Sequence, residues 1–313
     1  MIFYYKTEDR KLKELDSACP GSWIHLYDPT PEEVELISTK YDIEHDFLTA
    51  ALDEEETPHT DKEDDQTLII VDIPVVEPEG TSFLYNSMPL GIIVREDMVI
   101  TVCLEETTII EDFMENRVKN FDTCKKTRFV LQLLYKSSTK YLQYLRQIDK
   151  STTLIENAMH KNLKNRELQG TLKMLKLEKS LVFFSTSLKS NEIVLEKLTK
   201  TSILKRYPED TDLLEDVIIE NKQAIEMASI YRDILKSTMA TFSSIMSNNL
   251  NNVMKLLTSI TIIIAVPTLI ASFWGMNVPV PFEKAPWGFG IMFGLSMVFA
   301  LVTVFILWRK KML

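Results

Sequence analysis

Three consecutive residues near the C-terminus, Gly275, Met276 and Asn277, offer oxygen ligands that carry no charge. Asn277 supplies an amide oxygen, and the backbone of a short hairpin supplies loose carbonyls. Neutral oxygen dipoles of this kind can select a cation and still release it, as conduction requires. The chemistry to expect at this point of the chain is recognition of a passing cation, and the tripeptide is where an ion filter could be built.

Two long uncharged stretches flank the tripeptide. No charged residue lies between Lys255 and Glu283, and none lies between Lys284 and Arg309. Each stretch is longer than the about 20 apolar residues that cross a bilayer core. The sequence therefore predicts two membrane crossings joined by a short polar hairpin.

A stripe of small and polar residues runs back from the hairpin at alternating spacings of three and four. Its members are Ser272, Thr268, Ala265, Thr261, Thr258, Met254, Asn251, Ser247, Ser244, Ala240 and Ser237. This spacing places side chains on one face of a helix in a left-handed supercoil. Hydroxyls and amides on that face would hydrate a central channel if several copies surrounded an axis. One chain offers only one such helix, so a pore requires a homo-oligomer.

Close helix packing is the alternative interpretation of this stripe. Small residues line the contacts between membrane helices, and Ser and Thr can bond back to their own helix. The stripe alone does not separate the two interpretations, and Met254 fits a pore or a packing gap equally well. The hairpin favours the pore, because a helix that merely packs needs no amide at its outer mouth.

Charge is distributed unevenly along the chain. The whole sequence holds 35 Lys and Arg against 45 Asp and Glu. The part after residue 254 is basic, so everything before it carries a net charge of about −14. Such a field repels nucleic-acid phosphates and attracts cations. The alternative interpretation is an ordinary acidic domain whose charge keeps it soluble. In either case no nucleic-acid partner is expected.

The two ends of the chain indicate its orientation. The N-terminus lacks the basic head and apolar stretch of a signal peptide, so we expect the acidic part to stay in the cytosol. Cys19, Cys103 and Cys124 are scattered and fit reduced cytosolic thiols. The tail Arg309–Lys311 is basic, and the positive-inside rule places it in the cytoplasm. We therefore expect a two-pass protein of the cell membrane with both termini cytoplasmic.

The N-terminal part mixes strand and helix signals. Gln66–Val76 predicts a strand, and Pro89–Val102 predicts a hairpin of two strands. Pro31–Ile37 predicts a helix with Thr30 as N-cap and a glutamate three residues further on, the arrangement of a capping box. Glu44–Leu52 predicts a second short helix. Together these elements indicate a compact α+β or α/β domain.

Helices dominate from about Lys125 onward. Apolar residues recur at helical spacing and glycine nearly vanishes, so we expect two long antiparallel helices that break near Gly170. Pro208 ends that region, and the next proline is Pro267. A helix from Thr211 to Trp274 would be roughly 95 Å long, with its last third inside the membrane.

These signals divide the chain into six parts. Residues 1–124 form a cytosolic α/β domain, 125–208 the antiparallel helices, 209–274 a stalk that becomes the first transmembrane helix, 275–286 the external loop, 287–308 the second transmembrane helix and 309–313 the basic tail. The stalk has an apolar face that we expect to pack on the two preceding helices. That face consists of Leu214, Val217, Ala224, Ala228, Tyr231, Leu235, Phe242 and Ile245.

Two segments around the hairpin resemble a known family. Asn251–Thr258 reads Asn-Asn-Val-Met-Lys-Leu-Leu-Thr, and Pro267–Asn277 ends on Phe-Trp-Gly-Met-Asn. With the basic tail and the acidic cytosolic part, they resemble the CorA family of magnesium transporters. The signature of that family is Gly-Met-Asn after the first of two C-terminal transmembrane helices. The likeness covers essentially the whole chain and is faint before residue 120.

The resemblance implies a funnel-shaped homopentamer. Each subunit would supply an N-terminal cytosolic α/β domain, a long helical stalk and two C-terminal transmembrane helices. Gly275, Met276 and Asn277 then form the outer selectivity ring. The pore-lining residues are Asn251 and Thr268 at polar positions, Leu257 at an apolar constriction, and Met254, Thr258, Thr261, Ala265 and Ser272.

The family is also gated by magnesium bound between cytosolic domains. Asp216 aligns with an acidic stalk residue of that sensor. Its partner lies in a segment that resembles Glu63–Asp65, so the expected regulatory ligands are Asp216, Asp64 and Asp65. The family usually has an aromatic residue where this chain has Gln66. A solvated acidic loop is the alternative interpretation of Asp64 and Asp65.

The expected function is therefore Mg2+ uptake. An inside-negative potential drives a divalent ion inward by roughly 4.6 kcal/mol per 100 mV. Mg2+ would be both the transported ion and the regulatory ligand, and the other partners would be membrane lipid and further copies of the chain. Hydrated Co2+ or Ni2+ would pass the same ring. A zinc transporter of the same fold and a non-conducting membrane-tethered sensor are the alternatives, and the absence of any catalytic constellation argues against an enzyme.

Overall fold

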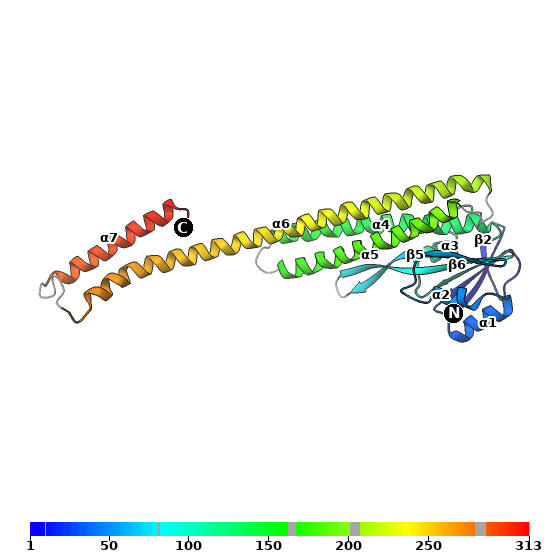
Figure 1. The fold of residues 1–313 in the computed structure, drawn as a ribbon, viewed down its shortest axis with the longest axis horizontal. Coiled ribbons are helices and arrows are strands. Elements are labelled where there is room, and N and C mark those ends of the chain that lie inside the picture. The colour runs from blue at the N-terminus through cyan, green and yellow to red at the C-terminus, as the bar shows by residue number, and fades with distance from the viewer. Residues whose placement is uncertain (10, 80–81, 162–166, 201–206, 279–285, 313) are drawn as a thin grey trace. The chain divides into compact units, whose positions relative to one another are not determined.

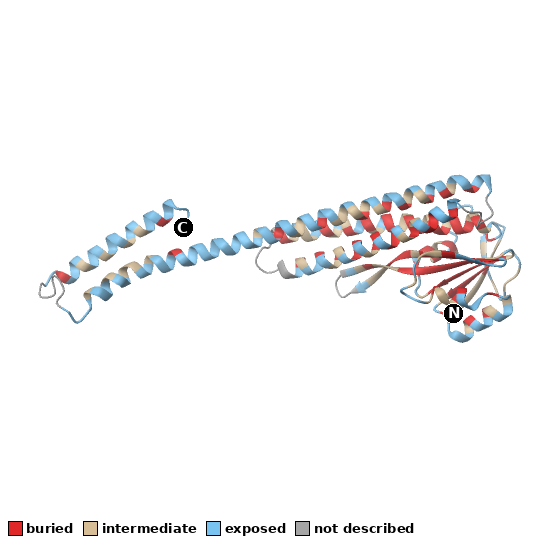
Figure 2. Ribbon diagram, viewed as in Figure 1, coloured by how far each residue is buried: buried red, intermediate tan, exposed pale blue. Residues whose placement is uncertain are grey.

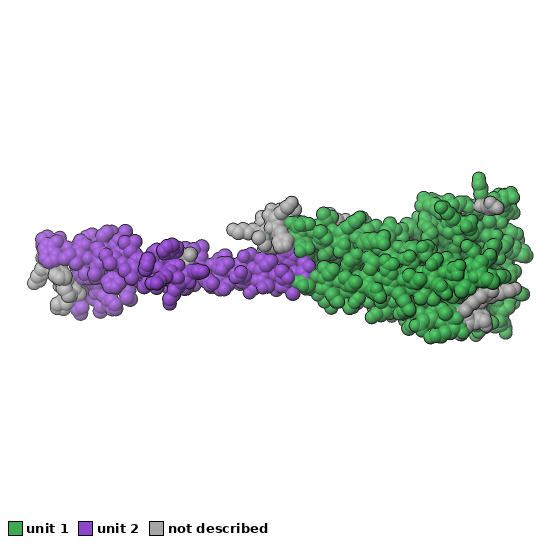
Figure 3. Space-filling model, turned by 90° about the horizontal axis from the view of Figure 1, so that it is seen from above, with its two compact units in different colours: residues 1–237 green, residues 238–313 purple. Residues whose placement is uncertain are grey.

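The computed structural model describes residues 1–9, 11–79, 82–161, 167–200, 207–278 and 286–312 (Figure 1). Two compact units divide the chain, Met1–Ser237 and Thr238–Leu313 (Figure 3). One sheet of seven strands lies in the first unit, in the order β2-β1-β3-β7-β6-β5-β4. Its strands are β1 (Ile2–Glu8), β2 (Lys11–Leu15), β3 (Ser22–Tyr27), β4 (His59–Glu63), β5 (Gln66–Glu79), β6 (Ser82–Val94) and β7 (Met98–Cys103).

All neighbouring strands of this sheet are antiparallel except β3 and β7, which are parallel. The predicted strand at Gln66 is confirmed, and the predicted hairpin turns between Val94 and Met98. Its first strand was predicted too short, because β6 begins at Ser82 and pairs with β5 over the whole length of both strands. Asn86 and Ser87 separate the start of β6 from the apolar run that follows, so a hydrophobicity pattern does not join the two parts.

Side chains alternate between the two faces of the sheet, as the period of a strand requires. Trp23 belongs to one core cluster and Ile24 to the other, and Ile69 and Ile70 divide in the same way. Two short helices, α1 (Pro31–Tyr41) and α2 (His45–Ala50), cover the face that carries Ile24 and Ile70. The sheet is therefore buried on both sides, which explains the long apolar runs in β5 and β7.

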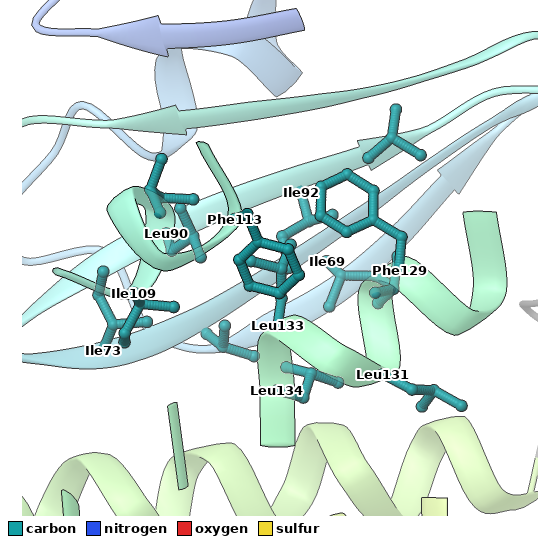
Figure 4. Close-up of a cluster of buried hydrophobic side chains, with 14 of the residues drawn as sticks. Ile69, Ile73, Leu90, Ile92, Ile109, Phe113, Phe129, Leu131, Leu133 and Leu134 are labelled. Carbon is teal, nitrogen blue, oxygen red and sulfur yellow. The ribbon is translucent and has the colours of Figure 1, made fainter. Parts of the chain in front are cut away.

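The other face packs against α3 (Thr108–Met114), α4 (Lys126–Lys161) and α5 (Glu167–Lys200). Figure 4 shows the centre of this cluster, where Phe113 and Phe129 project onto Ile69 and Ile92 of the sheet. The rings of Phe113 and Phe129 lie 5.4 Å apart between centroids, and the Trp23 ring lies 5.1 Å from that of Phe129. This aromatic cluster joins the sheet to the long helices.

Hydrogen bonds fix the short helices at the rim of the sheet. Thr30 accepts from the backbone of Glu33, whose side chain accepts from the backbone of Thr30, so the predicted capping box is confirmed. Gln66 is buried and bridges the two short helices: its Nε2 donates to Asp42 O at 2.8 Å, and its Oε1 accepts from Glu44 N at 3.1 Å. The amide at this position therefore holds the joint between α1 and α2.

Helices α4 and α5 lie side by side and run in opposite directions, as predicted (Figure 1). α4 ends at Lys161 and α5 begins at Glu167, so the change from one helix to the next lies near Gly170 as predicted, although Gly170 itself lies in the first turn of α5. A Cβ on Gly170 would stand 2.7 Å from Met159 Sδ of α4. The glycine permits close approach of the two helices instead of ending one of them.

The longest element is α6 (Pro208–Trp274), a single helix of 67 residues. Its first part packs within the first unit, where Arg128 of α4 pairs with Asp210 at 3.5 Å and Asn221 Nδ2 donates to Leu188 O of α5 at 3.1 Å. The predicted apolar face is largely buried there: Leu214, Val217, Ala224, Ala228 and Leu235 are all buried. The first unit thus holds the beginning of α6 firmly.

The second unit consists of the rest of α6 and of α7 (Gly288–Arg309). Both helices are long and apolar enough to cross a membrane. In the most apolar 18-residue window of each, only 6% of the residues are buried within the chain. Figure 2 shows this contrast with the red interior of the first unit. Residues 279–285 of the predicted external loop lie outside the described residues.

Candidate ion pathway

The tripeptide lies where α6 ends. Gly275 N donates to Ala271 O at 2.9 Å, the last regular helical bond, and Met276 N reaches Phe273 O at 3.4 Å. A Cβ on Gly275 would lie only 3.2 Å from Ala271 O, so a larger residue would crowd the end of the helix. Asn277 follows directly and is exposed, as is Met276. The amide of Asn277 therefore stands at the end of the helix with its oxygen available for a ligand.

The polar stripe is exposed along its whole length. All eleven of its members, from Ser237 to Ser272, are solvent-exposed in the single chain, and so is Leu257. None of the predicted pore-lining residues is covered by α7. The stripe therefore does not pack against the rest of its own subunit. It can contact only water, lipid or other copies of the chain.

The opposite face of α6 is the one that α7 covers. Beyond Met246, the residues of α6 that lose exposure are Ser259, Ile263, Val266, Pro267, Ile270 and Trp274, and those of α7 are Gly288, Met292, Ser296, Ala300, Thr303 and Leu307. At about 100° per residue, Thr261 and Thr268 lie about 200° and 180° around the helix from Ser259. The stripe and the covered face thus occupy opposite sides of α6.

The hydroxyls of two threonines in the stripe donate hydrogen bonds to backbone carbonyls of the same helix. Thr261 Oγ1 donates to Leu257 O, and Thr268 Oγ1 donates to Ile264 O, both at 2.9 Å. The predicted back-bonding of Ser and Thr is therefore present, and it does not conflict with a pore. Because each hydroxyl hydrogen is engaged, the oxygen can offer only lone pairs to a ligand. Such a surface accepts hydrogen bonds and therefore suits the outward-pointing hydrogens of a hydrated cation.

The expected regulatory ligands all lie in the first unit and are all exposed. Asp64 occupies the turn between β4 and β5 with a left-handed φ of 45°, and Asp65 follows it. Asp216 lies on α6, between the buried residues Leu214 and Val217. Within the described part of one chain, no three His, Cys, Asp or Glu residues gather into a metal site. A site built from Asp64, Asp65 and Asp216 would have to form between subunits.

Sequence reasoning missed a basic partner of one of these ligands. Arg95 Nε lies 3.3 Å from Asp65 Oδ2 and 3.4 Å from Asp97 Oδ1, and its guanidinium also donates to Tyr41 O. Arg95 lies about thirty residues from Asp65 along the chain, and only the pairing of β5 with β6 brings them together. In the single chain Asp65 is thus held by a guanidinium, whereas Asp64 is available for a further ligand.

Comparison with known proteins identifies relatives over nearly the whole chain. A family profile described as "CorA-like Mg2+ transporter protein" matches residues 21–311. The "Cobalt/magnesium transport protein CorA" of Methanocaldococcus jannaschii is 31% identical over 295 residues, which cover 92% of this chain and 90% of that protein.

Solved structures give the same picture. "The complete structure of CorA magnesium transporter from Methanocaldococcus jannaschii" matches with a TM-score of 0.86 at 26% identity, over 99% of this chain and 98% of that one. The cytoplasmic domain of ZntB from Vibrio parahaemolyticus matches with a TM-score of 0.59 at 12% identity, over 80% of this chain and 97% of that one. At that identity the second likeness concerns the fold alone.

Proposed function

The chain belongs to the CorA-like family of Mg2+ transporters, and from this premise we propose that it carries Mg2+ through a membrane pore lined by α6. The observation that carries the proposal is the exposed polar stripe, which ends at Asn277 and lies opposite the face covered by α7. The expected α/β N-terminal domain, long helix and two C-terminal apolar helices are confirmed by the match to the full-length relative. The relatives named for cobalt and magnesium extend the proposal to Co2+ as a second permeant ion.

Recognition of the hydrated ion follows from the chemistry of the stripe. Mg2+ is small and releases its water ligands reluctantly, so a pore conducts it best with the hydration shell in place. Asn277 Oδ1, the Gly275 carbonyl and the engaged hydroxyls of Thr268 and Thr261 all accept hydrogen bonds from that shell. A ring of carboxylates would hold a divalent ion more tightly and slow its exit.

A pore of this kind requires several copies around one axis, because a single α6 offers one stripe. We take the assembly to be a homopentamer in the membrane, with both termini in the cytoplasm. The direction of flow is then inward, driven by the inside-negative potential. The protein performs no catalysis in this account, and Mg2+ is its cargo.

Closure of the pore is assigned to Mg2+ in the cytoplasm. A cation held between Asp216 of one subunit and Asp64 or Asp65 of a neighbour would stabilise the closed state by binding that state more tightly. The ion pair between Arg95 and Asp65 leaves Asp64 as the freer of the two acidic partners. Loss of the ion would leave like charges facing each other, which repel and loosen the assembly.

The test is ion flux into liposomes that contain the purified protein under an inside-negative potential. Mg2+ should enter, Co2+ should enter as well, and Asn277→Ala should reduce both. A protein that passes Zn2+ but no Mg2+ would support the zinc alternative. A protein that passes neither ion would be a non-conducting sensor, and the transport proposal would be wrong.

A further inference from the structure

Ser259 is the one residue of the α6 segment between Asn248 and Thr261 whose side chain is buried. Its neighbours Thr258 and Ile260 are exposed, whereas Ser259 has no exposed surface. Its Oγ donates a hydrogen bond to Met312 O at 3.0 Å, beyond the end of α7. The end of the second membrane helix is therefore bonded to a single site on the pore helix.

This bond differs from those of three threonines in the second unit. Thr261, Thr268 and Thr303 each donate to the carbonyl four residues earlier in their own helix. Such bonds satisfy a hydroxyl in an apolar environment without linking two segments. Ser259 has the same option and instead bonds across to a carbonyl from another segment. The contact is thus a link between α6 and the chain that follows α7.

A helix-terminating turn presents the Met312 carbonyl to Ser259. Lys311 adopts a left-handed φ of 55°, Lys311 N donates to Trp308 O, and Met312 N donates to Leu307 O, both at 3.0 Å. This pair of bonds is the Schellman arrangement that ends many helices. Leu307, which the turn folds over, is buried. The backbone beyond α7 is therefore held in one conformation, and that conformation points its carbonyl at α6.

The link lies at the level of the expected constriction. Leu257 precedes Ser259 by two residues, so it lies about 200° around the helix on the same turn. Leu257 is exposed on the side of the stripe, and Ser259 is buried on the side of α7. Widening a pore at Leu257 would move α6 towards its covered face, so opening would break this bond unless the end of α7 moved by the same amount.

We propose that Ser259 is a positioning residue, whose hydroxyl clamps the end of α7 to α6 behind Leu257 and so stabilises the narrow, closed form of the pore. The inference rests on the proposed pore. Ser259 touches no ion, and it acts through the helix that carries Leu257. Loss of the clamp makes opening easier and leaves the conducting surface unchanged.

The test measures Mg2+ flux in liposomes at a series of internal Mg2+ concentrations. For Ser259→Ala, we expect the internal concentration that halves the flux to rise about fivefold, which corresponds to roughly 1 kcal/mol. The maximal flux at low internal Mg2+ should stay the same, since the stripe is intact. Thr303→Ala is the matched control: it removes a hydroxyl at the covered face of α7 that bonds only within its own helix. The proposal is wrong if wild type and Ser259→Ala have the same half-inhibiting internal Mg2+ concentration. It is also wrong if Thr303→Ala shifts that concentration as much as Ser259→Ala does.

A second pair of variants tests the turn without touching Ser259. Lys311→Gly and Lys311→Ile remove the same charge, but glycine adopts a positive φ readily and isoleucine does not. We expect Lys311→Ile to reproduce the shift of Ser259→Ala and Lys311→Gly to behave as wild type. Equal behaviour of the two would assign any effect to the charge and contradict the clamp. If the wild-type protein itself carries no Mg2+, the proposed function fails and not the clamp alone.

Discussion

The two units of the chain use apolar residues in opposite ways. The first unit buries them in two clusters on the faces of one sheet, and Trp23, Phe113 and Phe129 are fully enclosed. The second unit leaves most of its large apolar side chains exposed, Phe289, Phe293 and Trp308 among them. One unit therefore completes its core within a single chain, whereas the other needs lipid and further copies to cover it.

This difference explains why small polar residues have different roles in the two units. In the first unit the buried amide of Gln66 and the buried hydroxyl of Thr101 are hydrogen-bonded to residues distant in the sequence, and these bonds fix the fold. In the second unit the polar residues gather on the exposed stripe, opposite the face covered by α7. Placing polar side chains inside an apolar membrane helix costs free energy unless they face water or one another. A path for a hydrated ion provides that environment.

The largest expected effect comes from filling the stripe. Thr261→Phe places a ring on the face proposed to line the pore, so Mg2+ flux should fall to that of protein-free liposomes. Leu301→Phe adds bulk at an exposed position of α7 and should conduct normally. Normal flux through Thr261→Phe would mean that this face of α6 does not line the path.

A matched pair of truncations tests the difference in burial directly. Phe113→Ala in the first unit should lower the free energy of unfolding by about 3–5 kcal/mol, because it leaves a cavity among packed rings. Phe293→Ala in the second unit removes a side chain that is 64% exposed, so we expect a change of about 0.5 kcal/mol or less. Thermal unfolding of the detergent-solubilised protein measures both. Similar losses would show that the second unit has a packed interior of its own.

Acid should weaken the first unit through one buried histidine. Burial lowers the pKa of His25 to about 4, although its Nδ1 lies 2.9 Å from Thr101 Oγ1. The unfolded chain then binds a proton at a higher pH than the folded chain, so stability falls as the pH drops from about 6.5 towards 4. Glutamine does not titrate, so over this pH range the free energy of unfolding of His25→Gln should fall by up to about 3 kcal/mol less than that of the wild type. Parallel pH profiles of the melting temperature in the two proteins would contradict this role.

The proposed regulatory site gives the smallest expected shift in transport. Asp216→Ala should raise the internal Mg2+ concentration that halves the flux by roughly five- to tenfold, a usual size for coupling between sites. Glu215→Ala removes a neighbouring exposed carboxylate that the sensor does not use, and it should leave the value unchanged. Unchanged inhibition in Asp216→Ala would refute its assigned role.

Local signals in the sequence predicted many elements correctly, because each depends on neighbouring residues. The capping box at Thr30 and the long helix that ends at Trp274 are examples, and so is the apolar face of the stalk. The sequence placed the helix boundary near Gly170 correctly, but it did not reveal that this glycine lies inside α5 and serves a contact with Met159 of α4. Tertiary contacts of this kind leave no periodic pattern in the sequence.

The candidate site shows the same limit. Its stripe and tripeptide are visible in the sequence, since they follow the period of a single helix. The ion pair between Arg95 and Asp65 depends on strand pairing, and the bond from Ser259 depends on the fold of the chain beyond α7. Nothing in the residue types alone indicates either contact, so only the structure reveals them.

The most direct test of the pore is chemical access to the stripe during transport. Thr268→Cys places a thiol on the exposed face of α6, and a positively charged thiol reagent added outside should then block Mg2+ influx. Wild type, with only Cys19, Cys103 and Cys124, and Leu301→Cys should both stay insensitive. Block of Thr268→Cys alone is the result that our account predicts. Undiminished influx through fully labelled Thr268→Cys would contradict an ion path along this stripe.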